Sequence, residues 1–236
     1  MNMNKINNFY TEQNLDDLFN GIVFINCDYT NILEKYYGLT MDDIESNEYI
    51  IHGFLRRLDT IKQCIINIYE IFPPDKIDLL NNDEQSNVTI NLHAFYINVF
   101  GCIDNLAHAF CKLKSIRIER SAVSFIHPEV KSQLKTQFKD YIGQKDLKKW
   151  YQYIENYRDS LAHRIPIYCA PSMKINGEGP DIICPFIKHS FYEKRVPEIK
   201  IHSQLISDWK TIVEIADKFY DELIYHKSLS ASHDNN

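Results

Sequence analysis

Glycine, proline and long apolar runs are scarce in this sequence, and each shortage excludes a class of protein. Only 7 Gly and 8 Pro occur among 236 residues, too few for the turns that a β-sandwich or β-barrel needs between its many short strands. No stretch approaches the roughly 18 consecutive apolar residues of a membrane-spanning helix. The sequence therefore predicts neither an all-β protein nor a membrane partner.

Closely spaced cysteine pairs are also missing. The 6 cysteines include no CxxC pair and show no regular spacing, and no apolar signal region stands near the first residue. Cysteines in such a context are typical of reduced core residues in the cytosol. We therefore predict a cytoplasmic protein.

The chain as a whole has no excess of basic charge. Its 26 basic and 32 acidic residues leave a net charge of −6, which disfavours a nonspecific duplex-DNA binder because such proteins neutralise phosphates. The charge is uneven, however. The segment from Lys112 to Arg164 holds 12 basic and 6 acidic residues, a local net charge of +6, so it can accept a polyanion.

Apolar and aromatic side chains are abundant. Hydrophobic residues make up 44% of the chain, which includes 13 Phe and 15 Tyr, and this content excludes disorder for most of the sequence. A chain of this length buries roughly 70–75% of its unfolded surface when it folds. It therefore needs no disulfide or metal for stability.

The apolar residues recur at helical spacing. Between Ile51 and Phe72 the gaps alternate between three and four residues, which predicts one buried helical stripe, and Pro73 and Pro74 end it. Similar patterns predict helices over residues 14–37 (interrupted near 26–29), 88–113, 129–142, 146–164 and 202–225. We expect an all-α fold, an antiparallel bundle of five to six helices.

The sequence predicts one domain over residues 13–227, between a flexible N-terminus (1–12) and a disordered tail (228–236). Residues 166–199 form an irregular insertion in this domain, because they hold five of the eight prolines. Two short apolar runs in this insertion could pair as a small hairpin.

Arginine and histidine stand close together where the helix over 146–164 ends before Pro166. The segment reads Arg158-Asp159-Ser160-Leu161-Ala162-His163. Guanidinium is always charged and offers a planar fork to phosphate oxygens, and imidazole can give or take a proton near neutral pH. The carboxylate of Asp159 precedes His163 by four residues, on the same helical face. These residues form a candidate pair for phosphodiester cleavage.

Arg158 and His163 do not point the same way, because five residues subtend about 140° on a helix. Two copies of the chain brought together across a two-fold axis would place four such groups around one phosphate. We therefore expect a homodimer. The alternative is a surface helix end where arginine and histidine merely satisfy carbonyl groups.

The segment Tyr157–Arg164 resembles the Arg-polar-x3-His signature of HEPN (higher eukaryotes and prokaryotes nucleotide-binding) domains. The helix Phe95–Phe110, with Gly101 and the run Asp104-Asn105-Leu106-Ala107, is similar to the helix that precedes this motif in bacterial HEPN proteins. The resemblance covers about residues 45–225. It implies an all-α bundle that dimerises through the motif helix.

The resemblance also implies an activity. Catalytic HEPN members cleave RNA without a metal or other cofactor, and the ribose 2′-hydroxyl attacks its own phosphate to leave a 2′,3′-cyclic phosphate. By this analogy His163 is the general acid or base, Arg158 stabilises the phosphorane and Asp159 positions the pair. The supporting residues are Tyr157, Arg164, Asp104 and Asn105. Such proteins are often toxins or anti-phage effectors, some with an antitoxin partner.

Two other functions remain open. Many HEPN-like domains bind without cutting, so the chain could be a non-catalytic interaction or nucleotide-binding module. A metal-dependent helical-bundle enzyme is the third hypothesis, because five of the nine histidines follow a carboxylate by four residues.

Asp104, Asn105 and His108 interrupt a nearly all-apolar helix, and we expect them to form a buried polar network.

Overall fold

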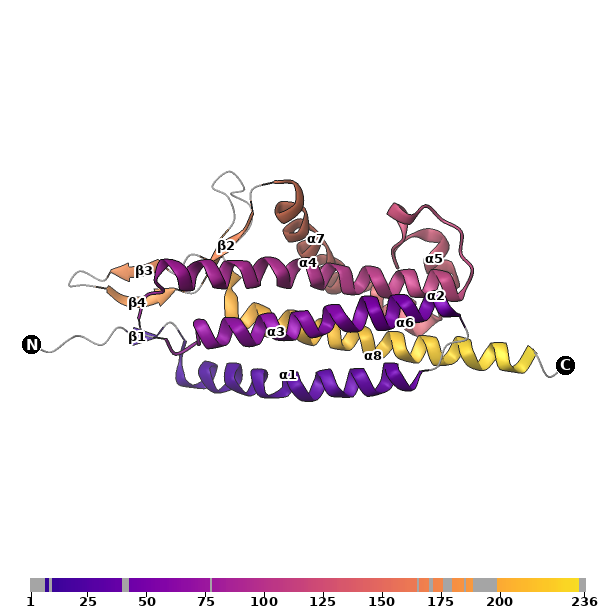
Figure 1. The fold of residues 1–236 in the computed structure, drawn as a ribbon, viewed down its shortest axis with the longest axis horizontal. Helices are drawn as coiled ribbons and strands as arrows, with labels where there is room; N and C mark the ends of the chain where they lie inside the picture. Colours follow the sequence, from indigo (N-terminus) through magenta and orange to yellow (C-terminus); the bar gives the residue numbers. More distant parts are fainter. Residues whose placement is uncertain are drawn as a thin grey trace, which may run out of the picture. The chain divides into compact units, whose positions relative to one another are not determined.

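The structure is a computed structural model that describes residues 7–8, 10–39, 43–76, 78–164, 166–169, 172–175, 180–184, 186–188 and 199–233. It is an all-α helical bundle, which confirms the predicted fold class. Five long helices dominate it (Figure 1): α1 (Glu12–Gly38), α3 (Arg56–Ile71), α4 (Asn82–Leu113), α7 (Lys145–His163) and α8 (Ile201–His233). The shorter elements are α2 (Ile44–Asn47), a π-helix (Glu48–Leu55), a 3-10 turn (Arg120–Ala122), α5 (Pro128–Gln133) and α6 (Thr136–Gly143).

The chain divides into two compact units. Unit 1 comprises residues 1–26, 60–97 and 157–209, and unit 2 comprises 27–59, 98–156 and 210–236. The single domain over residues 13–227 stays a prediction. Every boundary between the units falls inside a continuous helix, where no linker or change of composition marks it.

Unit 1 has a helical core and carries the strands of the structure. Its core includes the buried side chains Ile61, Ile65, Ile68, Val88, Leu92, Phe95, Ile201, Leu205 and Trp209. One three-stranded sheet has the order β1-β4-β3, from β1 (Asn7–Asn8), β4 (Pro180–Cys184) and β3 (Ser172–Ile175). The other has the order β2-β5-β6, from β2 (Tyr168–Cys169), β5 (Phe186–Lys188) and β6 (Ile199–Lys200). The β3–β4 and β2–β5 pairs are antiparallel and lie in the insertion where the sequence predicts a hairpin.

The first residues are more ordered than the sequence predicts. Strand β1 pairs with β4 in parallel, and Tyr10 is buried. The Tyr10 hydroxyl lies 3.3 Å from Nδ1 of His202, and Nε2 of the same ring lies 2.6 Å from the Phe72 carbonyl oxygen. These contacts join the N-terminal segment to the start of α8. The rest of the predicted flexible segment, residues 1–6 and 9, lies outside the described residues.

Two helices are longer than the sequence predicts. Helix α1 continues through residues 26–29, and α8 continues to His233, although the sequence predicts a disordered tail from residue 228. Neither Gly nor Pro occurs in residues 26–29 or 226–233, so nothing local breaks these helices. The remaining tail residues, 234–236, lie outside the described part.

Unit 2 shows two breaks that the apolar pattern does not reveal. The predicted helix over 129–142 is divided into α5 and α6, and the Lys135 amide at the break donates a hydrogen bond to Glu222 Oε1 at 2.7 Å. The predicted helix ahead of Pro73 begins with the π-helix. At Gly101 on α4 a Cβ atom would lie only 2.6 Å from Cζ of Arg57. Glycine here lets Arg57 lie against the helix.

The described residues contain no helix that is long and apolar enough to span a membrane.

Candidate functional site

The last turns of α7 in unit 1 are packed on one face and open on the other. Tyr157 is 1% exposed and stacks on Tyr96 of α4, with ring centroids 4.5 Å apart and an interplanar angle of 11°. Ser160 is fully buried, whereas His163 and Arg164 are exposed. Stacking and burial fix the orientation of the helix. The predicted supporting residue Tyr157 therefore holds the helix end in place.

The helix end brings Arg158 and Asp159 together. Nε of Arg158 lies 3.2 Å from Oδ1 of Asp159, and each side chain is 31% exposed. Among the described residues, His163 makes no hydrogen bond or ion pair with Asp159. In this structure Asp159 therefore positions the guanidinium, while the imidazole of His163 is left exposed at the end of α7.

The chain that follows the motif is attached to α4 by three polar side chains. Nε2 of His93 lies 2.7 Å from the carbonyl oxygen of Ile167, and Gln85 Nε2 donates to the carbonyl oxygen of Cys169 at 2.8 Å. The Cys169 amide donates to Thr89 Oγ1 at 3.2 Å. These bonds hold the backbone just beyond His163 and Arg164.

The apolar pattern does not reveal this contribution of α4, but the polar residues carry a signal for it. Gln85, Thr89 and His93 follow one another at intervals of four residues, so they lie on one helical face. The apolar pattern predicts this helix only from residue 88, whereas α4 begins at Asn82. Asn81 caps this helix by accepting a hydrogen bond from the Glu84 amide at 2.9 Å, and the Glu84 carboxylate accepts one from the Asn81 amide at 2.9 Å, a capping box.

The other two predicted supporting residues, Asp104 and Asn105, belong to unit 2. Asn105 Oδ1 accepts a hydrogen bond from Nε of Arg57 at 2.9 Å. Oδ2 of Asp104 lies 3.8 Å from Nε2 of His108, which is 7% exposed and stacks on Tyr49 with centroids 4.9 Å apart. Of the buried polar network that the sequence predicts inside α4, only His108 is buried, since the Asp104 side chain is 42% exposed and Asn105 has a different partner.

The electrostatics of His108 follow from this position. Burial lowers the pKa of His108, the negative charge of Asp104 opposes the shift, and the positive charges of Arg120 and Lys112 add to it. The neutral ring is therefore favoured, which suits its stacking on Tyr49.

A pocket of about 640 Å³ opens beside His108 in unit 2. Three basic residues and two acidic residues line it, namely Lys112, Arg117, Arg120, Asp43 and Glu45. Lys112 pairs with Glu45, and Asp43 caps α2 by accepting a hydrogen bond from the Ser46 amide at 2.6 Å. Arg117 and Arg120 form no ion pair within the described part of the chain, so the pocket has two cationic groups for an anion.

No family model, curated protein or solved structure matches this chain. Its function must therefore be inferred from its own residues.

The carboxylate–histidine pairs do not assemble into a metal centre. Within the ranges that the structure describes, no group of three or more His, Cys, Asp or Glu side chains could hold a metal ion. The closest such pair is Glu222–His226, with 2.9 Å between Oε1 and Nε2, and its carboxylate already accepts the Lys135 amide. Glu198, the partner predicted for His202, lies outside the described residues. The metal-dependent hypothesis thus has no candidate ligand set among the residues described.

Proposed function

We propose that this protein is a metal-independent endoribonuclease whose active residues are Arg158 and His163, with Asp159 positioning the arginine. The observation that supports this is the end of α7, where Tyr157 packs against Tyr96 while the paired Arg158 is partly exposed and His163 is exposed. An anchored helix holds its side chains more precisely than a loop does. A partly exposed guanidinium and an exposed imidazole are accessible to an RNA phosphate.

The proposed reaction is an internal transfer at phosphorus. One imidazole takes the proton of a ribose 2′-hydroxyl, and the resulting oxygen attacks the adjacent phosphorus. The bond from phosphorus to the 5′-oxygen breaks, and that oxygen takes a proton from a second imidazole. The products are a 2′,3′-cyclic phosphate and a 5′-hydroxyl. The guanidinium of Arg158 stabilises the negative charge that develops on the phosphoryl oxygens.

This reaction uses two imidazoles, and within the ranges that the structure describes the end of α7 has one, that of His163. We therefore propose a homodimer in which the α7 ends of two copies face one phosphate, so that the second copy supplies the other imidazole. Such an enzyme fits a role in defence or in a toxin–antitoxin pair, with RNA as substrate and an antitoxin as partner.

The first test is cleavage of total RNA by the purified protein in EDTA. We expect fragments that end in cyclic phosphate, and at least about a 100-fold lower rate in Arg158→Ala and in His163→Ala, because acid–base catalysis supplies about 10²–10⁴-fold. Cells that express the wild-type protein should stop growing, whereas cells that express either variant should grow.

His52→Ala is the matched control. His52 is 49% exposed in its side chain and follows Glu48 by four residues at 4.0 Å, so it resembles His163 without the arginine. Cleavage that persists in His163→Ala, or that is lost equally in His52→Ala, contradicts the proposed site.

The second test addresses the composite site. Mixing wild-type protein with His163→Ala yields mixed dimers that hold a single intact His163. If each copy supplies one imidazole to one phosphate, purified mixed dimers should cleave RNA at least about tenfold more slowly than wild-type dimers. Native mass spectrometry of differently tagged chains shows whether mixed dimers form. Mixed dimers that keep half of the wild-type rate or more would exclude the composite site.

The His108 pocket favours a second candidate function, that of a non-catalytic binding module. Arg117 and Arg120 would bind the phosphate of a mononucleotide there, beside the stacked Tyr49 and His108 rings. Adenosine monophosphate is the probe for calorimetry. The module hypothesis expects binding that survives His163→Ala, that is lost in the double variant Arg117→Ala/Arg120→Ala, and that comes without RNA cleavage under any condition.

A further inference from the structure

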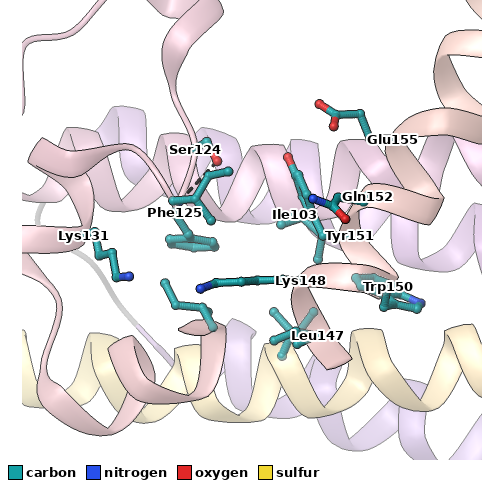
Figure 2. A pocket seen from close by; sticks show the side chains of 13 residues that line it. Ile103, Ser124, Phe125, Lys131, Leu147, Lys148, Trp150, Tyr151, Gln152 and Glu155 are labelled. Atoms are coloured by element: carbon teal, nitrogen blue, oxygen red, sulfur yellow. Dashed lines mark hydrogen bonds between the residues drawn. The ribbon is translucent and has the colours of Figure 1, made fainter. Parts of the chain in front are cut away.

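A second pocket of unit 2 lies apart from the residues discussed above. It has a volume of about 330 Å³ and lies beside the segment Ser124–Ile126, with walls from α4, α6 and α7 (Figure 2). Its apolar walls come from Ile103, Phe125, Ile142, Leu147, Trp150 and Tyr151. Pockets of roughly 300–1,000 Å³ with apolar walls and few polar groups are typical small-molecule sites.

Two lysines give this pocket its charge. Figure 2 shows Lys131 of α5 and Lys148 of α7 extending from opposite sides toward the space beside the Phe125 ring. Neither lysine forms an ion pair within the described part of the chain, whereas the adjacent Lys149 has Asp146 at 3.4 Å. Two ammonium groups that face one space repel each other. An anion between them would remove this repulsion.

Size and charge define the ligand. The volume of about 330 Å³ corresponds to roughly eleven water-sized groups at about 30 Å³ each. The lining carries two positive charges, from Lys131 and Lys148, and one negative charge, from Glu155, so a single negative charge makes it neutral. A dianion would leave an excess negative charge beside apolar walls, which is unfavourable.

We propose that this pocket binds a small amphipathic carboxylate, with the carboxylate between Lys131 and Lys148 and an aliphatic or aryl body against Phe125, Leu147 and Trp150. The lining of this pocket includes neither Arg158 nor His163, so the proposal does not depend on the proposed ribonuclease activity. It provides the chain with a binding function for a small metabolite of this chemical class.

Octanoate, 1-octanol and octylamine test the proposal on the full-length protein, because they share one apolar chain and differ in head-group charge. Trp150 lines the pocket, so its fluorescence should change on binding and should not respond in Trp150→Phe, while calorimetry measures affinity independently. We expect one octanoate per chain, bound at least about tenfold more tightly than 1-octanol, and weaker binding still for octylamine. Equal affinity for all three compounds, or no binding of any, would overturn the proposal.

Single lysine variants locate the carboxylate. Lys131→Met and Lys148→Met keep most of the apolar stem and should each weaken octanoate binding about tenfold. Lys148→Arg should retain most of the affinity, and Lys149→Met is the matched control that should leave it unchanged. An equal loss in Lys149→Met contradicts the site.

An oligonucleotide provides the remaining arm of the test. A uridine octamer that displaces octanoate, and whose binding is weakened by both lysine variants, would make this pocket part of an RNA surface and would overturn the carboxylate assignment. Octanoate binding that is unaffected by the octamer supports it.

Discussion

His163 in unit 1 and His108 in unit 2 both follow an aspartate by four residues on a helix, but they have opposite surroundings. His108 lies 3.8 Å from Asp104, stacks on Tyr49 and is 7% exposed. His163 is exposed, and its aspartate pairs with Arg158 instead. The same spacing thus produces a packed polar network in one unit and an accessible imidazole in the other. Spacing alone does not decide whether a histidine is available for chemistry.

The position along the helix explains the difference. His108 lies within α4, where neighbouring elements cover it, whereas His163 is the last residue of α7. His226 on α8 resembles His108, since it bonds a carboxylate that is 1% exposed. The covered histidines contact neighbouring groups of the fold, and the histidine at the helix end is exposed. The three predictions below test this contrast.

The largest effect on stability is expected at Glu222. Its carboxylate accepts a hydrogen bond from the Lys135 amide at 2.7 Å and lies 2.9 Å from Nε2 of His226, so Glu222→Ala removes both of these contacts of a buried carboxylate. We expect a loss of about 3–5 kcal/mol in the free energy of unfolding. Asp159→Ala, which breaks a pair whose side chains are 31% exposed, should cost less than about 1 kcal/mol. Urea unfolding measures the stability of both variants. Equal losses in the two would contradict the predicted difference between the buried and the partly exposed carboxylate.

The next effect concerns His202 and pH. Burial lowers the pKa of His202 from 6.5 to about 4, against the opposing hydrogen bond to Phe72. The folded state disfavours protonation of this ring, so the neutral ring contributes in full to the free energy of unfolding above pH 6.5. This contribution is lost as the pH falls from 6.5 through 4, because the unfolded chain binds the proton first. The loss amounts to about 3 kcal/mol.

Urea unfolding at pH 7, 5.5 and 4 measures this loss. The control is His202→Gln, which keeps a hydrogen-bonding side chain but does not titrate, and it should lose much less stability over the same range. The same acid dependence in both proteins would show that His202 is not its source.

The smallest effect is expected at Asp104. The carboxylate raises the pKa of His108 against the lowering effect of burial, so Asp104→Asn should lower that pKa further. Because the Asp104 side chain is 42% exposed and the atoms are 3.8 Å apart, the stability cost should be below about 1 kcal/mol. A titration followed by NMR measures the shift. An unchanged pKa of His108 in Asp104→Asn would contradict the predicted effect of the Asp104 charge on this ring.

Much of the fold can be read from local patterns. The alternation of three and four residues from Ile51 to Phe72 predicts α3, Pro73 and Pro74 end it, and Pro166 marks the end of α7. These features depend on residues within one or two helical turns of each other, so they can be recognised in a single sequence. The break at Lys135 is not visible in the same way, because its amide bonds to Glu222, which is distant in the chain. Nothing in the apolar spacing marks the π-helix over Glu48–Leu55.

The features of the candidate site likewise fall into those that depend on nearby residues and those that depend on distant ones. The sequence by itself determined that Arg158, Asp159 and His163 occur at the end of one helix, because Pro166 is incompatible with a longer one. Only the tertiary structure decided that Tyr157 stacks on Tyr96 and that Asn105 accepts a hydrogen bond from Arg57. Helix formation depends on neighbours three and four residues apart, whereas the pairing of polar side chains depends on which helices the apolar core brings together.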